Sequence, residues 1–214
     1  MIADVPAFIR ANTKILSPPH VPELRLHLAD DAVALWEMTE EQLGEIGLPP
    51  PFWAFAWAGG QALARYVLDH AKCVAGKRVL DVASGSGLVA IAAMKAGARS
   101  ACAADIDGFC APAALLNAEL NDVTISASDA DPLGQPTDAE AILVGDLFYD
   151  REIATRLLAW LQMLHAEGRT VLVGDPGRTY LPKHALEQVA SYEVPTPQAL
   201  EDAEAKKTGV WKLR

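Results

Sequence analysis

Apolar and polar positions change their spacing along this chain, and after residue 76 two patterns alternate. Short runs that are apolar throughout, such as residues 141–144, are followed by longer amphipathic segments. A strand is apolar throughout when helices cover both faces of a parallel sheet. The pattern predicts strands near 78–82, 99–104, 123–127, 140–145 and 169–174, and helices near 87–96, 108–120, 150–166 and 182–190.

The end of the chain departs from this alternation. Residues 192–194 and 210–213 look like two strands without a full crossover helix between them. We expect them to pair antiparallel at the sheet edge. Alternating strands and helices otherwise predict right-handed crossovers. The expected fold class is therefore α/β, with a doubly wound, mostly parallel sheet of seven strands.

The N-terminal part is less regular. Residues 4–14 predict a short helix, and residues 24–28, which alternate with period two, predict a strand. Thr39 opens another short helix as its N-cap, with Gln42 at the capping-box position.

An unusually aromatic segment, residues 52–60, precedes the regular part, and a helix then runs to about His70. No repeat or low-complexity stretch divides the remainder of the chain. We therefore expect a short N-terminal extension over residues 1–50 and one domain over residues 51–214.

Composition narrows the class of protein. The 214 residues are 51% hydrophobic and 21% charged, which is enough to bury the core of one large domain. No run reaches the roughly 18 apolar residues of a membrane span. The N-terminus also lacks the apolar core of a secretory signal. Three cysteines without a C-x-x-C pair indicate a reducing compartment, so we expect a cytoplasmic protein away from membranes.

The net charge of −10 bears on the partner. Such a chain repels nucleic-acid phosphates unless a basic patch overrides the charge, and the sequence shows no such patch. The acidity suits a neutral small molecule or a lysine-bearing protein surface, or it serves solubility alone. The five histidines lack metal-ligand spacing, so we expect no metal.

The main candidate site follows the strand predicted at 78–82. The apolar run ends in Asp81, and a glycine-rich turn leads into a helix. Ligands of open α/β sheets bind at the carboxyl ends of strands, where glycine lets the backbone approach and the helix offers N–H groups. Asp105 comes 18 residues after Gly87, a spacing that suits an acid accepting hydrogen bonds from ribose hydroxyls.

The identity of the nucleoside depends on Asp81. Residues 85–90 also satisfy G-x-G-x-x-G/A, the dinucleotide motif, but that match alone is weak. A buried acid is unfavourable beside a pyrophosphate, whereas S-adenosylmethionine carries a cationic amine and a sulfonium and has no phosphate. We therefore expect S-adenosylmethionine, with a nicotinamide cofactor and a purely structural turn as alternatives.

The turn and its acid resemble motif I of the seven-strand S-adenosylmethionine-dependent methyltransferases, acid-x-Gly-x-Gly-x-Gly. The resemblance implies a Rossmann-like class I methyltransferase fold. This sequence departs at Ala83, where the family usually has glycine. A methyl group is tolerated at this position if the backbone φ stays negative.

A second motif follows the fourth strand. Residues 145–149, Gly-Asp-Leu-Phe-Tyr, lack the Pro-Pro of amide and nucleobase amine methyltransferases. Asp-x-x-Tyr resembles instead the Asp/Glu-x-x-Tyr/Phe motif of the family-16 lysine methyltransferases. The structural alternative is a strand end before a helix that Asp146 or Asp150 caps.

Other segments sharpen the resemblance. Residues 51–63 resemble the Trp-x-Gly-Gly-x-x-Leu segment of the electron transfer flavoprotein β-subunit lysine methyltransferases, as do residues 104–107 with Asn117, and residues 174–182. The likeness runs from about residue 8 to the C-terminus. Ribosomal protein L11 methyltransferases share motif I and the ribose acid, but these other segments discriminate better.

The resemblance implies a set of cofactor contacts at the loop and strand ends: Trp57, Asp81, Ala83, Ser84, Gly85, Ser86, Gly87, Asp105, Ile106, Asp129, Asp131, Gly145 and Asp146. In this set the turn holds the methionine portion, and Asp81 orders the turn and contacts the amine through water. Asp105 holds the ribose, Asp129 or Asp131 contacts the adenine amine, and Trp57 forms a wall of the pocket.

The resemblance also implies the reaction. Asp146 and Tyr149 orient the incoming lysine and are the expected catalytic residues. The expected function is protein-lysine N-methylation of the electron transfer flavoprotein β subunit by a monomeric enzyme, in the mitochondrial matrix if the source has mitochondria. The alternatives are a ribosomal-protein (L11 or L7/L12) methyltransferase, a small-molecule N-methyltransferase and a non-catalytic binding module. The intact turn argues against the module, and the short extension before Trp53 argues against the separate substrate domain of L11 enzymes.

Overall fold

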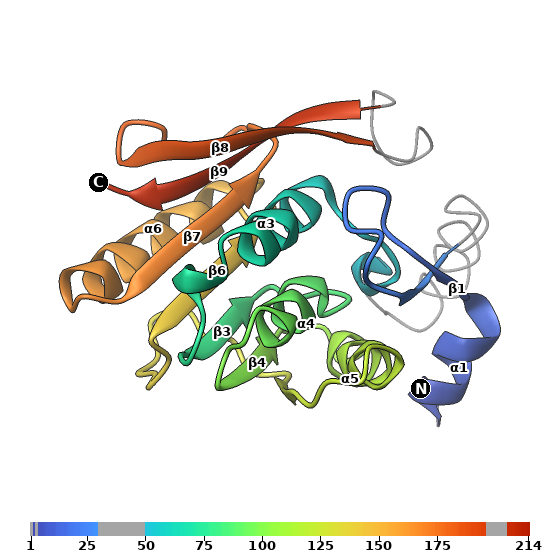
Figure 1. Ribbon diagram of the computed structural model, residues 1–214. Helices are drawn as coiled ribbons and strands as arrows, with labels where there is room; N and C mark the ends of the chain where they lie inside the picture. The colour runs from blue at the N-terminus through green and yellow to red at the C-terminus, as the bar shows by residue number, and fades with distance from the viewer. Residues whose placement is uncertain (1, 3, 30–49, 196–204) are drawn as a thin grey trace.

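Seven strands form one sheet in the computed structural model, which describes residues 2, 4–29, 50–195 and 205–214. The spatial order of the strands is β5-β4-β3-β6-β7-β9-β8 (Figure 1). Their bounds are β3 (Arg78–Val82), β4 (Ser100–Ala104), β5 (Ser126–Ser128), β6 (Ala141–Gly145), β7 (Thr170–Asp175), β8 (Leu186–Pro195) and β9 (Ala205–Leu213). The pairs among β3 to β7 are parallel, and β9 is antiparallel to both β7 and β8. The predicted α/β sheet of seven strands is confirmed.

Helices lie on both faces of this sheet (Figure 1). One face carries α3 (Ala58–Asp69), α4 (Leu88–Lys95) and α5 (Cys110–Leu120), and the other carries α6 (Arg151–Ala166). Successive side chains of a strand point to opposite faces of the sheet and pack into a separate hydrophobic core on each face. Leu143 of β6 packs with α3 and α4, whereas Ile142 and Val144 pack with α6. Burial on both faces explains the continuous apolar runs.

The chain before α3 packs on α5. It contains α1 (Val5–Asn12), the antiparallel strands β1 (Lys14–Leu16) and β2 (Leu26–Leu28), and the 3-10 turn η1 (Phe52–Ala54); a second such turn, η2 (Ala71–Cys73), follows α3. Phe8 and Trp53 contact Phe109 with ring centres 5.7 and 5.8 Å apart. The short helix expected at Thr39 lies outside the described residues, and the boundary at residue 50 stays a prediction. None of the helices described has the length and apolarity to cross a membrane.

The helix predicted at 182–190 is wrong. The chain turns at residues 183–185 and then enters β8, which pairs with β9 from Leu186 opposite Leu213. Leu186 is buried against the α6 side and Val194 against the α3 side. Local helix preference is weak, and this long-range pairing, which buries both ends of the strand, overrides it. The antiparallel pairing expected for the last two strands is confirmed.

The N-terminus of α3 lies unusually close to the ends of β6 and β7. A Cβ on Gly59 would lie 2.3 Å from the Gly174 carbonyl oxygen and 2.4 Å from Asp146 Oδ2. A Cβ on Gly174 would lie 2.1 Å from the Gly59 carbonyl oxygen, and one on Gly145 would lie 3.2 Å from the Gly60 backbone. Glycine at these positions lets a helix backbone rest directly on two strand ends.

Gly59→Ala therefore should lower the free energy of unfolding by about 1–3 kcal/mol, because its methyl group overlaps backbone that cannot move aside. Gly60→Ala is the matched control, since its Cβ meets no atom within 4 Å. In the control, higher helix propensity should leave stability unchanged or raise it by up to about 1 kcal/mol. Urea unfolding of both variants measures the difference, and equal stability of the two would contradict this account of the close contact.

Candidate functional site

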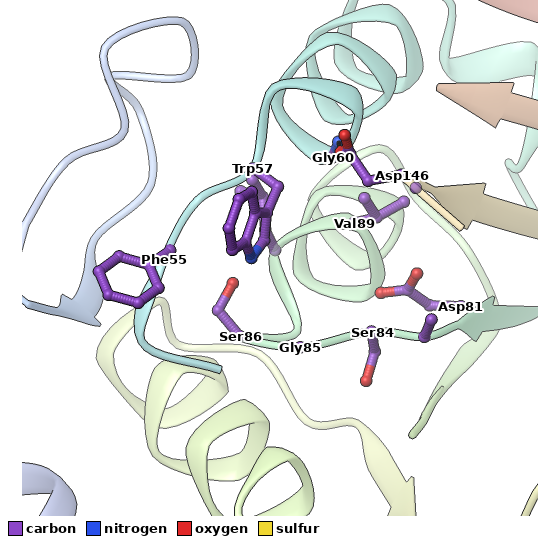
Figure 2. Close-up of a pocket in the computed structure, with 12 residues that line it drawn as sticks. Phe55, Trp57, Gly60, Asp81, Ser84, Gly85, Ser86, Val89 and Asp146 are labelled. Carbon is purple, nitrogen blue, oxygen red and sulfur yellow. Dashed lines mark hydrogen bonds between the residues drawn. The ribbon is translucent and has the colours of Figure 1, made fainter. Parts of the chain in front are cut away.

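A pocket opens where the carboxyl ends of β3 and β6 meet the N-termini of α3 and α4 (Figure 2). Most of the predicted cofactor residues line it: Trp57, Asp81, Ala83, Ser84, Gly85, Ser86, Gly145 and Asp146. Four further residues line it without having been assigned a role from sequence: Phe55, Gly60, Leu88 and Val89. In Figure 2, Phe55 and Trp57 stand on one side of the pocket, with Asp81 and Ser84 on the other. The segment 52–60 therefore forms one wall.

Asp81 is fully enclosed at the end of β3, with 1% of its surface exposed. Its Oδ2 accepts a hydrogen bond from the Ala90 N–H at 2.9 Å. Ala90 lies in the first turn of α4, whose N-cap Gly87 has no side chain, so Asp81 caps this helix from a neighbouring strand. Burial raises the Asp81 pKa to about 8, the bond from Ala90 opposes that rise, and the nearby charge of Asp105 adds to it.

The turn between Asp81 and α4 has a left-handed backbone at three positions. Gly85 and Gly87 have φ values of 50° and 77°, and a Cβ on Gly87 would lie 2.6 Å from the Ala114 Cβ of α5. Ala83 has φ 54°. The condition under which a methyl group is tolerated at this position, a negative φ, is therefore not met, and the left-handed backbone of Ala83 costs about 1–2 kcal/mol.

Asp105 joins the end of β4 to this turn. Its Oδ2 accepts the Gly85 N–H at 2.9 Å, and its Oδ1 accepts the Asp107 N–H at 3.1 Å. Each carboxylate oxygen can accept more than one hydrogen bond, so hydroxyl donors can still bind there. Ser84 Oγ is buried and has no hydrogen-bond partner within the described part of the chain. The Asp105 carboxylate, an acceptor, and the Ser84 hydroxyl, a donor, fit the ribose hydroxyls and the carboxylate of S-adenosylmethionine.

The two candidates for the adenine contact differ in their partners. Asp131 accepts the Leu133 N–H at 2.9 Å and forms an ion pair with Arg156 at 2.8 Å. Asp129 is exposed and directly follows β5, at the same edge of the sheet as Asp81 and Asp105. The structure thus places Asp129 at a strand end and turns the Asp131 carboxylate towards α6.

Asp146 caps α3 in the way that Asp81 caps α4. Its Oδ2 accepts the Gly60 N–H at 3.0 Å, in the first turn of the helix, and its backbone has φ 54°. Its Oδ1 accepts a hydrogen bond from Arg178 Nη2 at 2.9 Å. Burial raises the Asp146 pKa, while the charge of Arg178 and the helix N–H groups oppose that rise. Both carboxylate oxygens are therefore engaged, which the sequence did not indicate.

Arg178 and Asp175 are two further residues beside the pocket to which sequence reasoning assigned no role. The Arg178 guanidinium lies over the Trp57 ring, 5.9 Å from its centre. Asp175 is fully buried at the end of β7, and its Oδ1 accepts the N–H groups of Gly177 and Arg178 at 2.7 and 2.6 Å. Burial and the charge of Asp146 raise the Asp175 pKa to about 6. The sequence signal for these two residues is the Asp-Pro-Gly-Arg segment, one of the segments that resemble the lysine methyltransferase family.

Tyr149 has 53% of its surface exposed and is not among the residues that line the pocket. Burial of the remainder raises its pKa, the charges of Asp105 and Asp150 add to the effect, and the charge of Arg178 opposes it. Ile106 is 71% exposed after β4. Asp150 is the N-cap of α6 and accepts the N–H groups of residues 152 and 153. The structural alternative, a cap on the helix after the motif, therefore holds for Asp150, whereas Asp146 caps α3.

Asn117 of α5 connects the N-terminal strands to the glycine turn. Its Oδ1 accepts the His27 N–H at 2.7 Å, and its Nδ2 donates to the Ser86 carbonyl at 2.8 Å. Asn117 is completely buried, so both bonds are shielded from water. No group of three or more histidine, cysteine or acidic side chains that could hold a metal occurs within residues 4–29, 50–195 and 205–214.

Known proteins are similar to this chain along nearly its whole length. An electron transfer flavoprotein beta subunit lysine methyltransferase of Danio rerio is 36% identical, with 98% of this chain and 83% of that protein covered. The Xenopus laevis protein of the same name is 38% identical, with 97% and 86% covered. The family model for ribosomal protein L11 methyltransferase (PrmA) matches residues 61–145.

Solved structures agree on the fold. The magnesium protoporphyrin IX methyltransferase of Synechocystis PCC 6803 with bound S-adenosylmethionine has a TM-score of 0.53 and 12% identity, and covers 72% of this chain and 78% of its own. The L11 family model matches residues 61–145, and an L11 methyltransferase of Deinococcus radiodurans, 33% identical, covers 63% of this chain and 50% of that protein. The flavoprotein-type match covers 98% of this chain. The chain belongs to the electron transfer flavoprotein beta subunit lysine methyltransferases, enzymes that use S-adenosylmethionine.

Proposed function

We propose that this protein methylates a lysine of the electron transfer flavoprotein β subunit. The observation that supports this best is the junction of two motifs in one pocket: the glycine turn after β3 and Asp146 after β6 line it together. The relatives' names supply the substrate, and identity at 36–38% over nearly the whole chain supports carrying it over.

In this proposal, residues in and beside the pocket bind S-adenosylmethionine. Ser84 to Gly87 hold the methionine portion, with its carboxylate towards the N-terminus of α4. Asp105 binds the ribose and Ile106 covers the nucleoside. We assign the adenine amine to Asp129, because Arg156 already engages Asp131. Asp81 orders the turn and, with its high pKa, adapts its charge to the cationic amine.

Lysine positioning falls to Asp146 and Tyr149. S-Adenosylmethionine supplies an electrophilic methyl carbon, so that the amine lone pair forms the N–C bond while the C–S pair stays on sulfur. The residues of this chain therefore need only to align the amine and to permit its deprotonation. Orientation alone can lower the barrier to methyl transfer by about 7–11 kcal/mol. We assign to Tyr149, whose side chain is half-exposed, the contact with the incoming lysine.

The setting of the reaction is also part of the proposal. The net charge of −10 favours a lysine-bearing protein over nucleic acid as partner. We further propose a monomer, located in the cytoplasm or, for a source with mitochondria, in the matrix.

Transfer of labelled methyl from S-adenosylmethionine into a host-cell extract tests the function. We expect one labelled band of the size of the flavoprotein β subunit, carrying methyl-lysine by mass spectrometry. Label on a ribosomal protein would contradict the flavoprotein substrate and favour the ribosomal-protein alternative. Label only in small molecules would contradict protein methylation, and no label despite measured cofactor binding would favour the binding module.

Asp146→Asn tests the role of the pocket acid. The amide keeps an acceptor for the Gly60 N–H but removes the charge, so single-turnover methyl transfer should fall by about 100-fold or more. Affinity for S-adenosylhomocysteine, measured by calorimetry, should change by less than about fivefold, because the turn after β3 is untouched. Asp138→Asn is the control, since this acid is largely exposed and pairs with Arg78 elsewhere. Loss of cofactor binding without a selective loss of turnover would refute the assignment.

Asp81→Asn tests whether that acid acts as a buried cap. Because the folded-state pKa of about 8 lies above the ordinary 3.8, native Asp81 holds a proton that the unfolded chain releases between these values. Wild-type stability then falls as pH rises from 4 to 8, and the asparagine variant lacks this loss. Urea unfolding should show the variant more stable by at least about 1 kcal/mol at pH 9 and nearly equal at pH 4. A difference that does not vary with pH would argue against protonated Asp81.

A further inference from the structure

The backbone of Arg178 is fixed by a hydrogen bond to Asp175. Asp175 Oδ1 accepts both the Gly177 and the Arg178 N–H groups, and Asp175 itself is fully buried. Gly177 has φ 93°, which lets the chain turn sharply after β7. The direction in which Arg178 leaves the backbone is therefore set by the sheet.

The guanidinium of Arg178 lies between a carboxylate and an aromatic ring. Nη2 donates to Asp146 Oδ1 at 2.9 Å, and the Trp57 ring centre is 5.9 Å from Cζ. A carboxylate and an aromatic face are also the groups that hold a lysine ammonium. A cation of the protein thus already occupies this side of Asp146, before any substrate arrives.

Charges around Arg178 are mostly negative. Asp146 faces it from the end of β6, Asp175 from β7 and the Tyr149 hydroxyl from the turn before α6. Behind Tyr149 lie Asp105 and Asp150, while α3 contributes the uncharged Trp57. Without Arg178, only the N–H groups at the start of α3 would compensate the charge of Asp146.

A lysine ammonium has no lone pair and must release a proton to solvent before it can accept a methyl group. A carboxylate within about 4–6 Å favours the charged form of an amine, whereas a nearby cation disfavours it. Building on the proposed function, we propose that Arg178 is a positioning residue that neutralises Asp146, so that the bound lysine loses its proton near neutral pH. Asp146 can then orient the amine without trapping it as the ammonium.

Single-turnover methyl transfer to the purified flavoprotein β subunit, measured from pH 6 to 10, tests this inference. In Arg178→Gln the midpoint of the rate should rise by about one pH unit, while the plateau rate at high pH stays within about threefold of wild type. Arg178→Lys keeps the charge and should keep the midpoint within a few tenths of a unit. Arg78→Gln, which removes an ion pair at the opposite end of β3, is the matched control and should overlay the wild type.

A second readout does not depend on turnover. Carbon NMR titration of the Asp146 carboxyl in the substrate-free enzyme should show a higher pKa in Arg178→Gln, since the opposing cation is gone. An equal loss of rate at every pH, or an unchanged Asp146 pKa, would overturn the inference and leave Arg178 a structural residue. If the NMR shift appears but wild type transfers no methyl to the subunit, the proposed function fails while the charge pairing stands.

Discussion

The contact between the N-terminus of α3 and the ends of β6 and β7 is the constraint on which the site depends. The backbones of Gly59 and Gly174 approach too closely for any side chain. This approach brings the Gly60 N–H within reach of Asp146 and places Trp57 beside the pocket. One wall of the pocket is therefore fixed by backbone packing, and the motif acid is fixed by the helix it caps.

An acid at a strand end caps a neighbouring helix twice at this edge of the sheet. Asp81 caps α4 from β3, and Asp146 caps α3 from β6. Each carboxyl group lies at the positive end of a helix dipole, which opposes the rise in its pKa that burial causes. The two acids differ in their second partner, because only Asp146 has an arginine. Two helix-capping acids in the same pocket therefore have different charge environments.

Features encoded within short stretches of chain were predictable. Asp81 and the glycine turn lie in one segment, and the parallel strands show as continuous apolar runs because both faces are covered. The pairing of Asp146 with Arg178, 32 residues apart, was not visible, since no local spacing encodes it. The failed helix at 182–190 has the same cause: its alternative is pairing with a strand that comes later in the chain.

The positive φ at Ala83 shows how the tertiary structure constrains the turn. Ala83 and Asp146 both have φ 54° and directly follow the strands that form the pocket edge. Strain of this kind persists only where neighbouring bonds over-determine the backbone. Here the Ser84 N–H binds the Ala104 carbonyl and the Gly85 N–H binds Asp105, so the two residues after Ala83 are both tied to the end of β4. Because those bonds hold the turn in position, the glycine turn can keep its shape although the first family glycine is replaced by alanine.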